Sequence, residues 1–128
     1  MKLLLDTHIW LWLLNEPHRI SPHLSLQLRD QANELWLSPI SVWEALTLYR
    51  KRRIQLWPDL EQWLKDATLA TREAPLTHEI ALASSLLVMH GDPADRLLAA
   101  TAQVLDLVLA TADQRLLGLG EIRTLANR

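Results

Sequence analysis

Carboxylate side chains recur in this sequence where an apolar run or a turn gives way to a helical pattern. The residues that share this placement are Asp6, Glu44, Asp92, Asp95 and Asp113. Mg²⁺ and Mn²⁺ prefer hard oxygen ligands, with one or two direct carboxylates completed by water and phosphate. Several carboxylates from separate strand ends therefore predict a Mg²⁺ or Mn²⁺ site.

Each of these acids also has a purely structural interpretation as a helix cap. Ser41-Val42-Trp43-Glu44 has the spacing of a capping box, and Asp92-Pro93-Ala94-Asp95 repeats that spacing with aspartates. Asp6 and Asp113 would equally serve as caps. The two interpretations are compatible, because a helix N-terminus stabilises negative charge and a divalent ion relieves the repulsion between crowded carboxylates.

Short apolar strands alternate along the chain with longer segments of helical spacing. Strands are expected at residues 3–5, 35–37, 107–110 and 122–125, with a proline-containing edge strand at 74–76. Helices are expected at residues 7–14, 22–33, 41–52, 59–71, 77–89 and 94–105. This alternation predicts an α/β fold with a mostly parallel sheet of about four or five strands, whose carboxyl ends would bring the acids to one edge.

The composition is that of one globular domain spanning residues 1–128, with a net charge of −2. The absence of cysteine excludes disulfides and thiolate metal sites. Asp6 interrupts the first apolar run too early for a signal peptide, and the run from Ile9 to Leu14 is too short to cross a bilayer. We therefore expect a cytoplasmic protein without membrane contact. Because that run has no polar face, it should be buried either in the core or against a partner subunit, and a homodimer is therefore also expected.

Four segments in order resemble the motifs of PIN-domain proteins, and most closely those of VapC-type toxins from type II toxin-antitoxin pairs. They are Leu4-Leu5-Asp6-Thr7, Ser41-Val42-Trp43-Glu44-Ala45, the run from His90 to Ala102 that contains Asp-Pro-Ala-Asp-Arg, and Leu109-Ala110-Thr111-Ala112-Asp113. The resemblance covers essentially the whole chain. It implies a three-layer α/β/α domain and an endoribonuclease that uses one or two Mg²⁺ or Mn²⁺ ions. It also implies tRNA or another structured RNA as substrate and a cognate antitoxin as partner.

The resemblance also suggests roles for individual residues. Asp6, Glu44 and Asp95 would be the principal acidic triad, with Asp113 as a fourth acid at the metal or its water. Asp92 would mainly cap a helix and support the site, with metal contact possible.

Polar residues beside the acids have more than one possible role. Thr7, Ser41 and Thr111 could hydrogen-bond metal-bound water or substrate phosphate, although capping is favoured for Ser41. Arg96 could pair with Asp95 or meet phosphate.

Basic and histidine residues near these motifs have several open interpretations. The run Arg50-Lys51-Arg52-Arg53 could contact an RNA backbone, contact an antitoxin tail, or be only a solvated helix end. His8 and His90 flank the motifs, and ordinary packing is favoured over a general-base role for both.

Two other functions compete with the nuclease interpretation. In a non-catalytic interaction module the carboxylates would be caps only. An aspartate-based phosphatase of the haloacid dehalogenase type also places an aspartate after its first strand. It is disfavoured because that chemistry needs a second aspartate two residues later, where this chain has His8.

Overall fold

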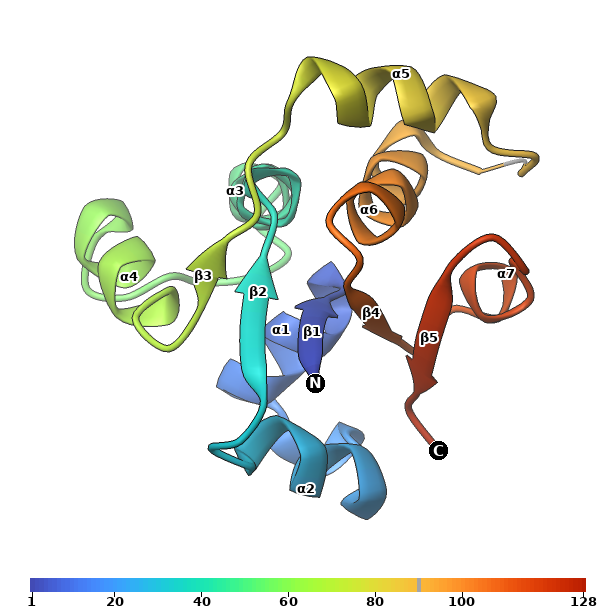
Figure 1. Ribbon diagram of the computed structural model, residues 1–128. Coiled ribbons are helices and arrows are strands. Elements are labelled where there is room, and N and C mark those ends of the chain that lie inside the picture. Colours follow the sequence, from blue (N-terminus) through green and yellow to red (C-terminus); the bar gives the residue numbers. More distant parts are fainter. Residues whose placement is uncertain (90) are drawn as a thin grey trace.

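The chain forms a central parallel sheet with helices on both sides, as seen in a computed structural model that describes residues 1–89 and 91–128 (Figure 1). The sheet has five strands in the order β3-β2-β1-β4-β5, and every neighbouring pair is parallel. The strands are β1 (Lys2–Leu5), β2 (Glu34–Leu37), β3 (Arg72–Glu73), β4 (Val108–Thr111) and β5 (Arg123–Ala126). The expected α/β class and parallel sheet are confirmed.

The helices connect these strands in the order expected from the sequence. They are α1 (Thr7–Asn15), the short 3₁₀ helix η1 (Pro17–Arg19), α2 (Pro22–Arg29), α3 (Pro39–Arg50), α4 (Leu60–Ala67), α5 (His78–Leu86), α6 (Pro93–Val104) and α7 (Gln114–Leu117). In the described part of the chain, no helix has the length and apolarity needed to cross a membrane.

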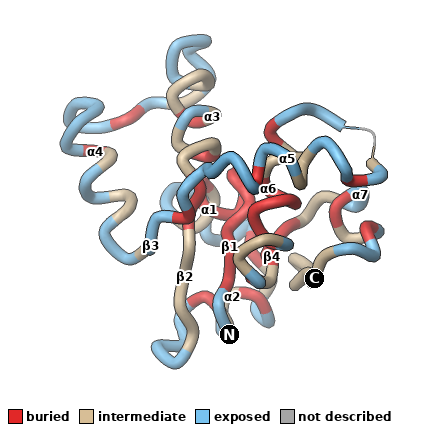
Figure 2. The backbone as a smooth tube through the Cα atoms, turned by 45° about the horizontal axis from the view of Figure 1, so that its top comes forward, coloured by how far each residue is buried: buried red, intermediate tan, exposed pale blue. Residues whose placement is uncertain are grey.

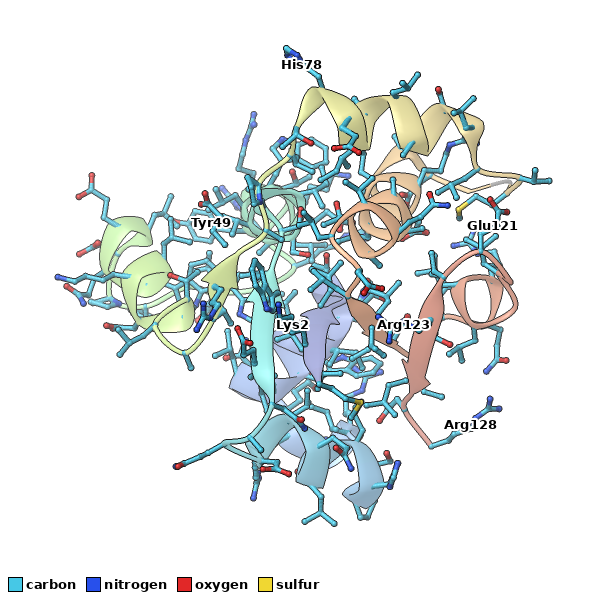
Figure 3. The ribbon with its side chains drawn as sticks, in the orientation of Figure 1. Lys2, Tyr49, His78, Glu121, Arg123 and Arg128 are labelled. Atoms are coloured by element: carbon cyan, nitrogen blue, oxygen red, sulfur yellow. The ribbon has the colours of Figure 1, made fainter. Side chains whose placement is uncertain are left out.

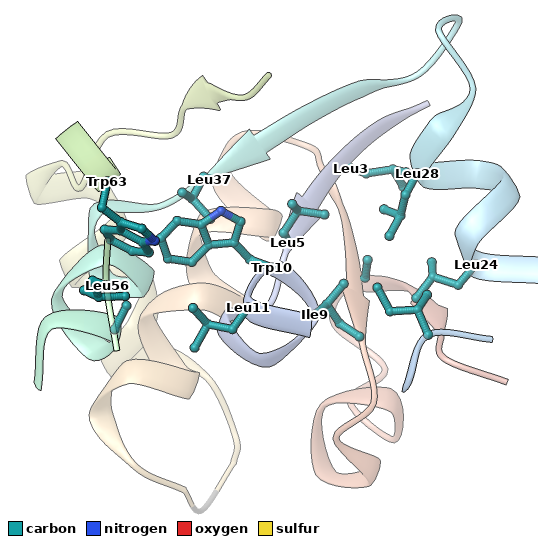
Figure 4. Packing of buried hydrophobic residues seen from close by; sticks show 13 residues of the cluster. Leu3, Leu5, Ile9, Trp10, Leu11, Leu24, Leu28, Leu37, Leu56 and Trp63 are labelled. Atoms are coloured by element: carbon teal, nitrogen blue, oxygen red, sulfur yellow. The ribbon is translucent and has the colours of Figure 1, made fainter. Parts of the chain in front are cut away.

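The central strand β1 separates two hydrophobic cores, one on each face of the sheet. Leu3 and Leu5 pack with side chains of α1, α2 and α4, including Trp10 and Trp63 (Figure 4). Leu4 points to the opposite face and joins the core built by α5, α6 and α7. Successive strand residues point to opposite faces, so this alternation explains the three layers. Figure 2 shows β1 buried in the middle of the molecule.

Side-chain caps fix where most helices begin. The capping side chains are Asp6 (α1), Ser21 (α2), Ser38 (α3), Asp59 (α4), Thr77 (α5), Asp92 (α6) and Asp113 (α7). The prediction that Ser41 starts α3 was wrong. Ser38 accepts a hydrogen bond from the amide of Ile40, and Pro39 occupies the first helical position that proline favours.

Other boundaries differ from the prediction by a few residues. Helix α2 ends at Arg29, α4 at Ala67 and α5 at Leu86, earlier than the expected residues 33, 71 and 89. The edge strand β3 occupies Arg72–Glu73, just before the expected 74–76. The amide of Ala74 still donates to the carbonyl of Leu37 at 2.9 Å, and Pro75 has no amide proton with which to continue the pairing.

The strand order reverses direction beside β1. Strands β2 and β3 follow on one side of β1, while β4 and β5 follow on the other. Ligands of open parallel sheets bind beyond the carboxyl ends of the strands at such a switch point. Asp6 directly follows β1, and Asp113 lies two residues after β4.

Candidate metal centre

Asp6 is held in a fixed position at the end of β1. Its amide donates to the carbonyl of Ala110 at 3.0 Å, which extends the pairing of β1 with β4. Oδ1 accepts from the amide of Thr7 at 2.8 Å, and Oδ2 accepts from the hydroxyl of Thr111 at 2.6 Å. The side chain is buried, and burial raises the pKa of Asp6 despite these hydrogen bonds.

Glu44 reaches the same place from the middle of α3. Its Oε1 accepts a hydrogen bond from the hydroxyl of Thr7, whose oxygen also lies 2.8 Å from Oγ of Ser41. A hydroxyl has one proton, so Thr7 donates to Glu44 while the Ser41 hydroxyl donates to Thr7. Burial raises the pKa of Glu44, the Thr7 hydrogen bond partly offsets this, and the charges of Asp92 and Asp6 raise it further. Ser41 therefore supports the acidic site through Thr7.

The N-terminus of α6 supplies two further carboxylates. Asp92 caps this helix by accepting from the amide of Asp95 at 2.9 Å, as expected from the sequence. Asp95 points into the site from the first turn. Burial, followed by the charges of Asp92, Asp6 and Asp113, raises the pKa of Asp95 to about 6, and Arg115 opposes these effects.

Asp113 completes the acidic edge beyond β4. Its Oδ1 accepts from the amide of Arg115 at 2.8 Å, and its own amide donates to the hydroxyl of Thr111 at 3.0 Å. The guanidinium of Arg115 lies 3.0 Å from Asp113 and 3.0 Å from Asp95. The side-chain hydrogen bond from Arg115 is the main reason why the pKa of Asp113 is lowered.

These side chains surround a cavity of about 300 Å³ at the switch point. It is lined by Asp6, His8, Trp12, Glu44, Asp92, Asp95, Ala112, Asp113 and Arg115. A larger groove of about 770 Å³ shares His8, Glu44 and Asp92 with this cavity and continues along α3 to Lys51. All five acids singled out in the sequence therefore meet at one cavity.

The donor set of the cavity suits a hard divalent cation. Burial is the main cause that raises the pKa values of Asp6, Glu44 and Asp95, and negative neighbours raise them further, so a cation would relieve this repulsion. Among the described residues, no three acidic or histidine side chains are already arranged around a common ion position. Thr7 and Thr111 hydrogen-bond two of the carboxylates, Glu44 and Asp6, and Arg115 pairs with two others.

Several residues considered at the sequence level lie away from this cavity or serve it differently. Arg96 does not meet the expectation of pairing with Asp95, because its guanidinium donates to the carbonyls of Met89 at 2.9 Å and Ser84 at 2.7 Å. It therefore ties the end of α5 to α6. His8 lines the cavity, whereas His90 lies outside the described residues.

Sequence reasoning missed Arg115. Its signal was available, since a cation two residues after an acidic helix cap lies within reach of the charges gathered there. The basic run from Arg50 to Arg53 is exposed at the end of α3, next to the far end of the large groove.

Comparison with known proteins places this arrangement in a family. The PIN domain family model matches residues 3–122. Ribonuclease VapC22 of Mycobacterium tuberculosis is 37% identical over 115 residues, which cover 88% of each protein. The chain therefore belongs to the PIN-domain family. Within that family it groups with the VapC proteins, as its sequence motifs predicted.

Solved structures of toxin-antitoxin complexes share the fold. The similarity to VapBC2 from Rickettsia felis bound to a promoter DNA fragment has a TM-score of 0.74 with 16% identity, and covers 98% of each chain. For VapBC-1 from nontypeable Haemophilus influenzae the TM-score is 0.71 with 17% identity, again over 98% of each chain. These similarities confirm the predicted fold.

Proposed function

We propose that this protein is the toxin of a type II toxin-antitoxin pair and acts as a Mg²⁺- or Mn²⁺-dependent endoribonuclease. The convergence of Asp6, Glu44, Asp95 and Asp113 on one cavity carries the proposal. The similarity to a VapC ribonuclease over most of the chain supports it.

The carboxylates of these four residues would hold one or two divalent ions. A bound ion supplies a hydroxide-like water at neutral pH and offsets negative charge on the scissile phosphate and leaving oxygen. Asp6 and Glu44 are oriented by Thr111 and Thr7, so their oxygens face the cavity in defined positions.

The acids and hydroxyls around this centre have supporting roles. Asp92 keeps α6 in place as its cap, and Ser41 positions Thr7. The amide of Asp113 fixes the hydroxyl of Thr111, which in turn donates to Asp6. No general base is required of His8 when carboxylates can orient the attacking water.

The alternative of a non-catalytic module explains only part of the acidic cluster. Asp6, Asp92 and Asp113 do cap helices, as that alternative requires. Glu44 and Asp95 do not cap their helices, because Ser38 caps α3 and Asp92 caps α6. Two half-buried carboxylates without a capping role, placed next to like charges, favour a cation-binding function.

The substrate would be RNA, with tRNA or another structured RNA as the class to test first. The exposed basic run Arg50 to Arg53 offers phosphate contacts beyond the groove that leaves the acidic cavity.

A cognate antitoxin would bind the apolar part of that groove. Trp43, Leu76 and Leu97 line it, and Trp43 is 59% exposed. The VapBC complexes among the structural relatives support such a partner. The proposed location of the protein is the cytoplasm.

A homodimer is also proposed, but through a different surface from the one suggested by the sequence. Ile9, Trp10 and Leu11 of α1 are buried within this chain, and of the rest of that run only Leu14 is exposed, at 40%, so α1 offers little apolar surface to a second chain. The side chains of Leu82 and Leu86 on α5 are 63% and 70% exposed. Exposed apolar side chains repeated on one helix are typical of an interface.

RNA cleavage with purified protein tests the proposed function. Wild type should cleave tRNA or total RNA with Mg²⁺ or Mn²⁺ and stop when EDTA is added. Asp6→Asn should lose cleavage, while Asp106→Asn, which alters an exposed aspartate paired with Arg123, should keep it. Equal cleavage by wild type and Asp6→Asn would point to a contaminating nuclease and refute the proposal.

A further inference from the structure

Arg115 places a positive charge where two of the proposed metal ligands meet. Its Nη2 atom donates to Oδ2 of Asp95 and to Oδ2 of Asp113, each at 3.0 Å. This nitrogen has two protons, so it can serve both carboxylates at once. One atom of the chain thus contacts two carboxylates at the same time.

The surroundings of Arg115 favour a movable contact. Its side chain is 58% exposed, whereas those of Asp95 and Asp113 are 13% and 26% exposed. The carboxylates therefore belong to the cavity, while the guanidinium reaches in from its rim. The Nε contact with Oδ1 of Asp113 is long, at 3.4 Å. Exposed ion pairs of this kind contribute little stability, so a divalent ion can displace them.

A second arginine pair shows that this location is specific. Arg123 on β5 donates through Nη2 to Oδ1 of Asp106 at 2.7 Å, on the surface at the sheet edge (Figure 3). That guanidinium also donates to the carbonyl of Asp106 and contacts no second carboxylate among the described residues. Of these two arginines, only Arg115 contacts acids from two different elements: Asp113 after β4 and Asp95 in the first turn of α6.

We propose that Arg115 is an internal counter-cation, which competes with the divalent ion for Asp95 and Asp113 and is released when the ion binds. The inference rests on the proposed metal centre. Arg115 is then a positioning residue that acts on the metal centre through its two ligands, because it occupies their oxygens until the ion arrives. By thermodynamic linkage, an interaction that stabilises the ion-free arrangement must weaken ion binding by the same factor.

Titration calorimetry with Mn²⁺ tests the competition. Arg115→Gln should bind Mn²⁺ about three- to tenfold more tightly than wild type, since two exposed ion pairs no longer have to be broken. Arg115→Lys keeps the charge but loses the fork geometry, so its affinity should fall between the two. The matched control Arg123→Gln should bind Mn²⁺ as wild type does. Circular dichroism would check that all variants are folded.

The outcomes separate this inference from the proposed function. Absence of Mn²⁺ binding by wild type and every variant would remove the metal centre and the competition together. Equal affinities of wild type and Arg115→Gln would overturn the competition alone. A third outcome would also overturn the competition: tighter Mn²⁺ binding by Arg115→Gln together with wild-type affinity in Arg115→Lys. The positive charge alone would then account for the difference in affinity, without the bidentate contact of the guanidinium.

Displacement of the guanidinium can be followed directly by NMR of the arginine Nε–Hε groups. The signal missing in Arg115→Gln identifies Arg115. The Arg123 signal is identified in the same way from Arg123→Gln. In wild type the Arg115 signal should shift on addition of diamagnetic Mg²⁺, while the Arg123 signal should keep its position. An Arg115 signal unchanged at saturating Mg²⁺ would contradict the release.

Discussion

At the residue scale, the pKa of Asp95 shows most clearly how burial and crowding affect the acids of the cavity. Its ordinary pKa is 3.8, and in the folded protein burial and the neighbouring acids raise the pKa to about 6. Between these values the folded state binds more protons than the unfolded state. The free energy of unfolding of the metal-free protein should therefore fall as pH rises from about 4 to about 6.

Asp95→Asn should reduce this loss of stability with pH. Asp6 and Glu44 act in the same direction because their pKa values are also raised, whereas Asp113 acts in the opposite direction. Thermal melts in EDTA between pH 4 and pH 7 would measure the difference. At pH 7 the variant should melt higher than wild type while losing RNA cleavage. An unchanged pH slope would show that Asp95 is not the titrating group.

A substitution at Thr111 tests whether the hydrogen bond that orients Asp6 affects RNA cleavage as well as stability. Thr111→Val removes the donor to Asp6, so we expect a loss of about 1–3 kcal/mol in unfolding free energy and about a 10- to 100-fold loss of metal-dependent cleavage. Thr101→Val is a matched control, because Thr101 is equally buried and bonds only the carbonyl of Leu97 within α6. Similar activity in both variants at a temperature where both are folded would contradict the orienting role.

Sequence reasoning found the acids more readily than their partners. The acids follow strands or turns, and their positions are therefore readable from local patterns. The partners of Thr7, Arg96 and Arg115 depend on how distant segments pack, which no local pattern gives. Ser41 had the spacing of a capping box, yet the tertiary contact with Thr7 accounts for its hydroxyl.

At the scale of elements, the residue at which α3 begins determines where Glu44 lies. Ser38→Ala removes the side chain that caps α3 and should lower the unfolding free energy by about 1 kcal/mol. The measurement is chemical denaturation, with Ser85→Ala on the exposed part of α5 as control. If Ser38→Ala were as stable as wild type, the cap would not define this helix.

Element boundaries show where local patterns were sufficient. Thr77 and Asp92 cap α5 and α6 as expected, because short polar side chains before helical periodicity mark an N-terminus directly. The C-terminal ends predicted for α2, α4 and α5 lie too late in the sequence. The residues just beyond the observed ends still fit helical periodicity, so only tertiary packing determines where the chain leaves the helix.

At the scale of the whole molecule, the exposed surface of α5 is the proposed dimer interface. If two chains associate through α5, Leu82→Glu should convert the dimer to a monomer in light scattering after size-exclusion chromatography. Leu69→Glu is a matched control, since Leu69 is 82% exposed between α4 and β3. A wild-type monomer, or a dimer that persists in Leu82→Glu, would rule out this face.

The arrangement of the whole chain follows from its central strand. Leu3, Leu4 and Leu5 fill both cores by alternation, and the strand delivers Asp6 to the point where the strand order reverses. The same sheet brings Asp113 beside it, and α3 and α6 contact each other and carry Glu44 and Asp95 to that edge. The cavity proposed to bind a cation is thus a direct product of the parallel topology.

A crystal grown with Mn²⁺ and measured for anomalous scattering tests this central claim most directly. We expect an anomalous peak in the cavity bounded by Asp6, Glu44, Asp95 and Asp113, with the guanidinium of Arg115 moved away from Asp95. An empty cavity at saturating Mn²⁺, or a peak only at other surface carboxylates, would contradict the account.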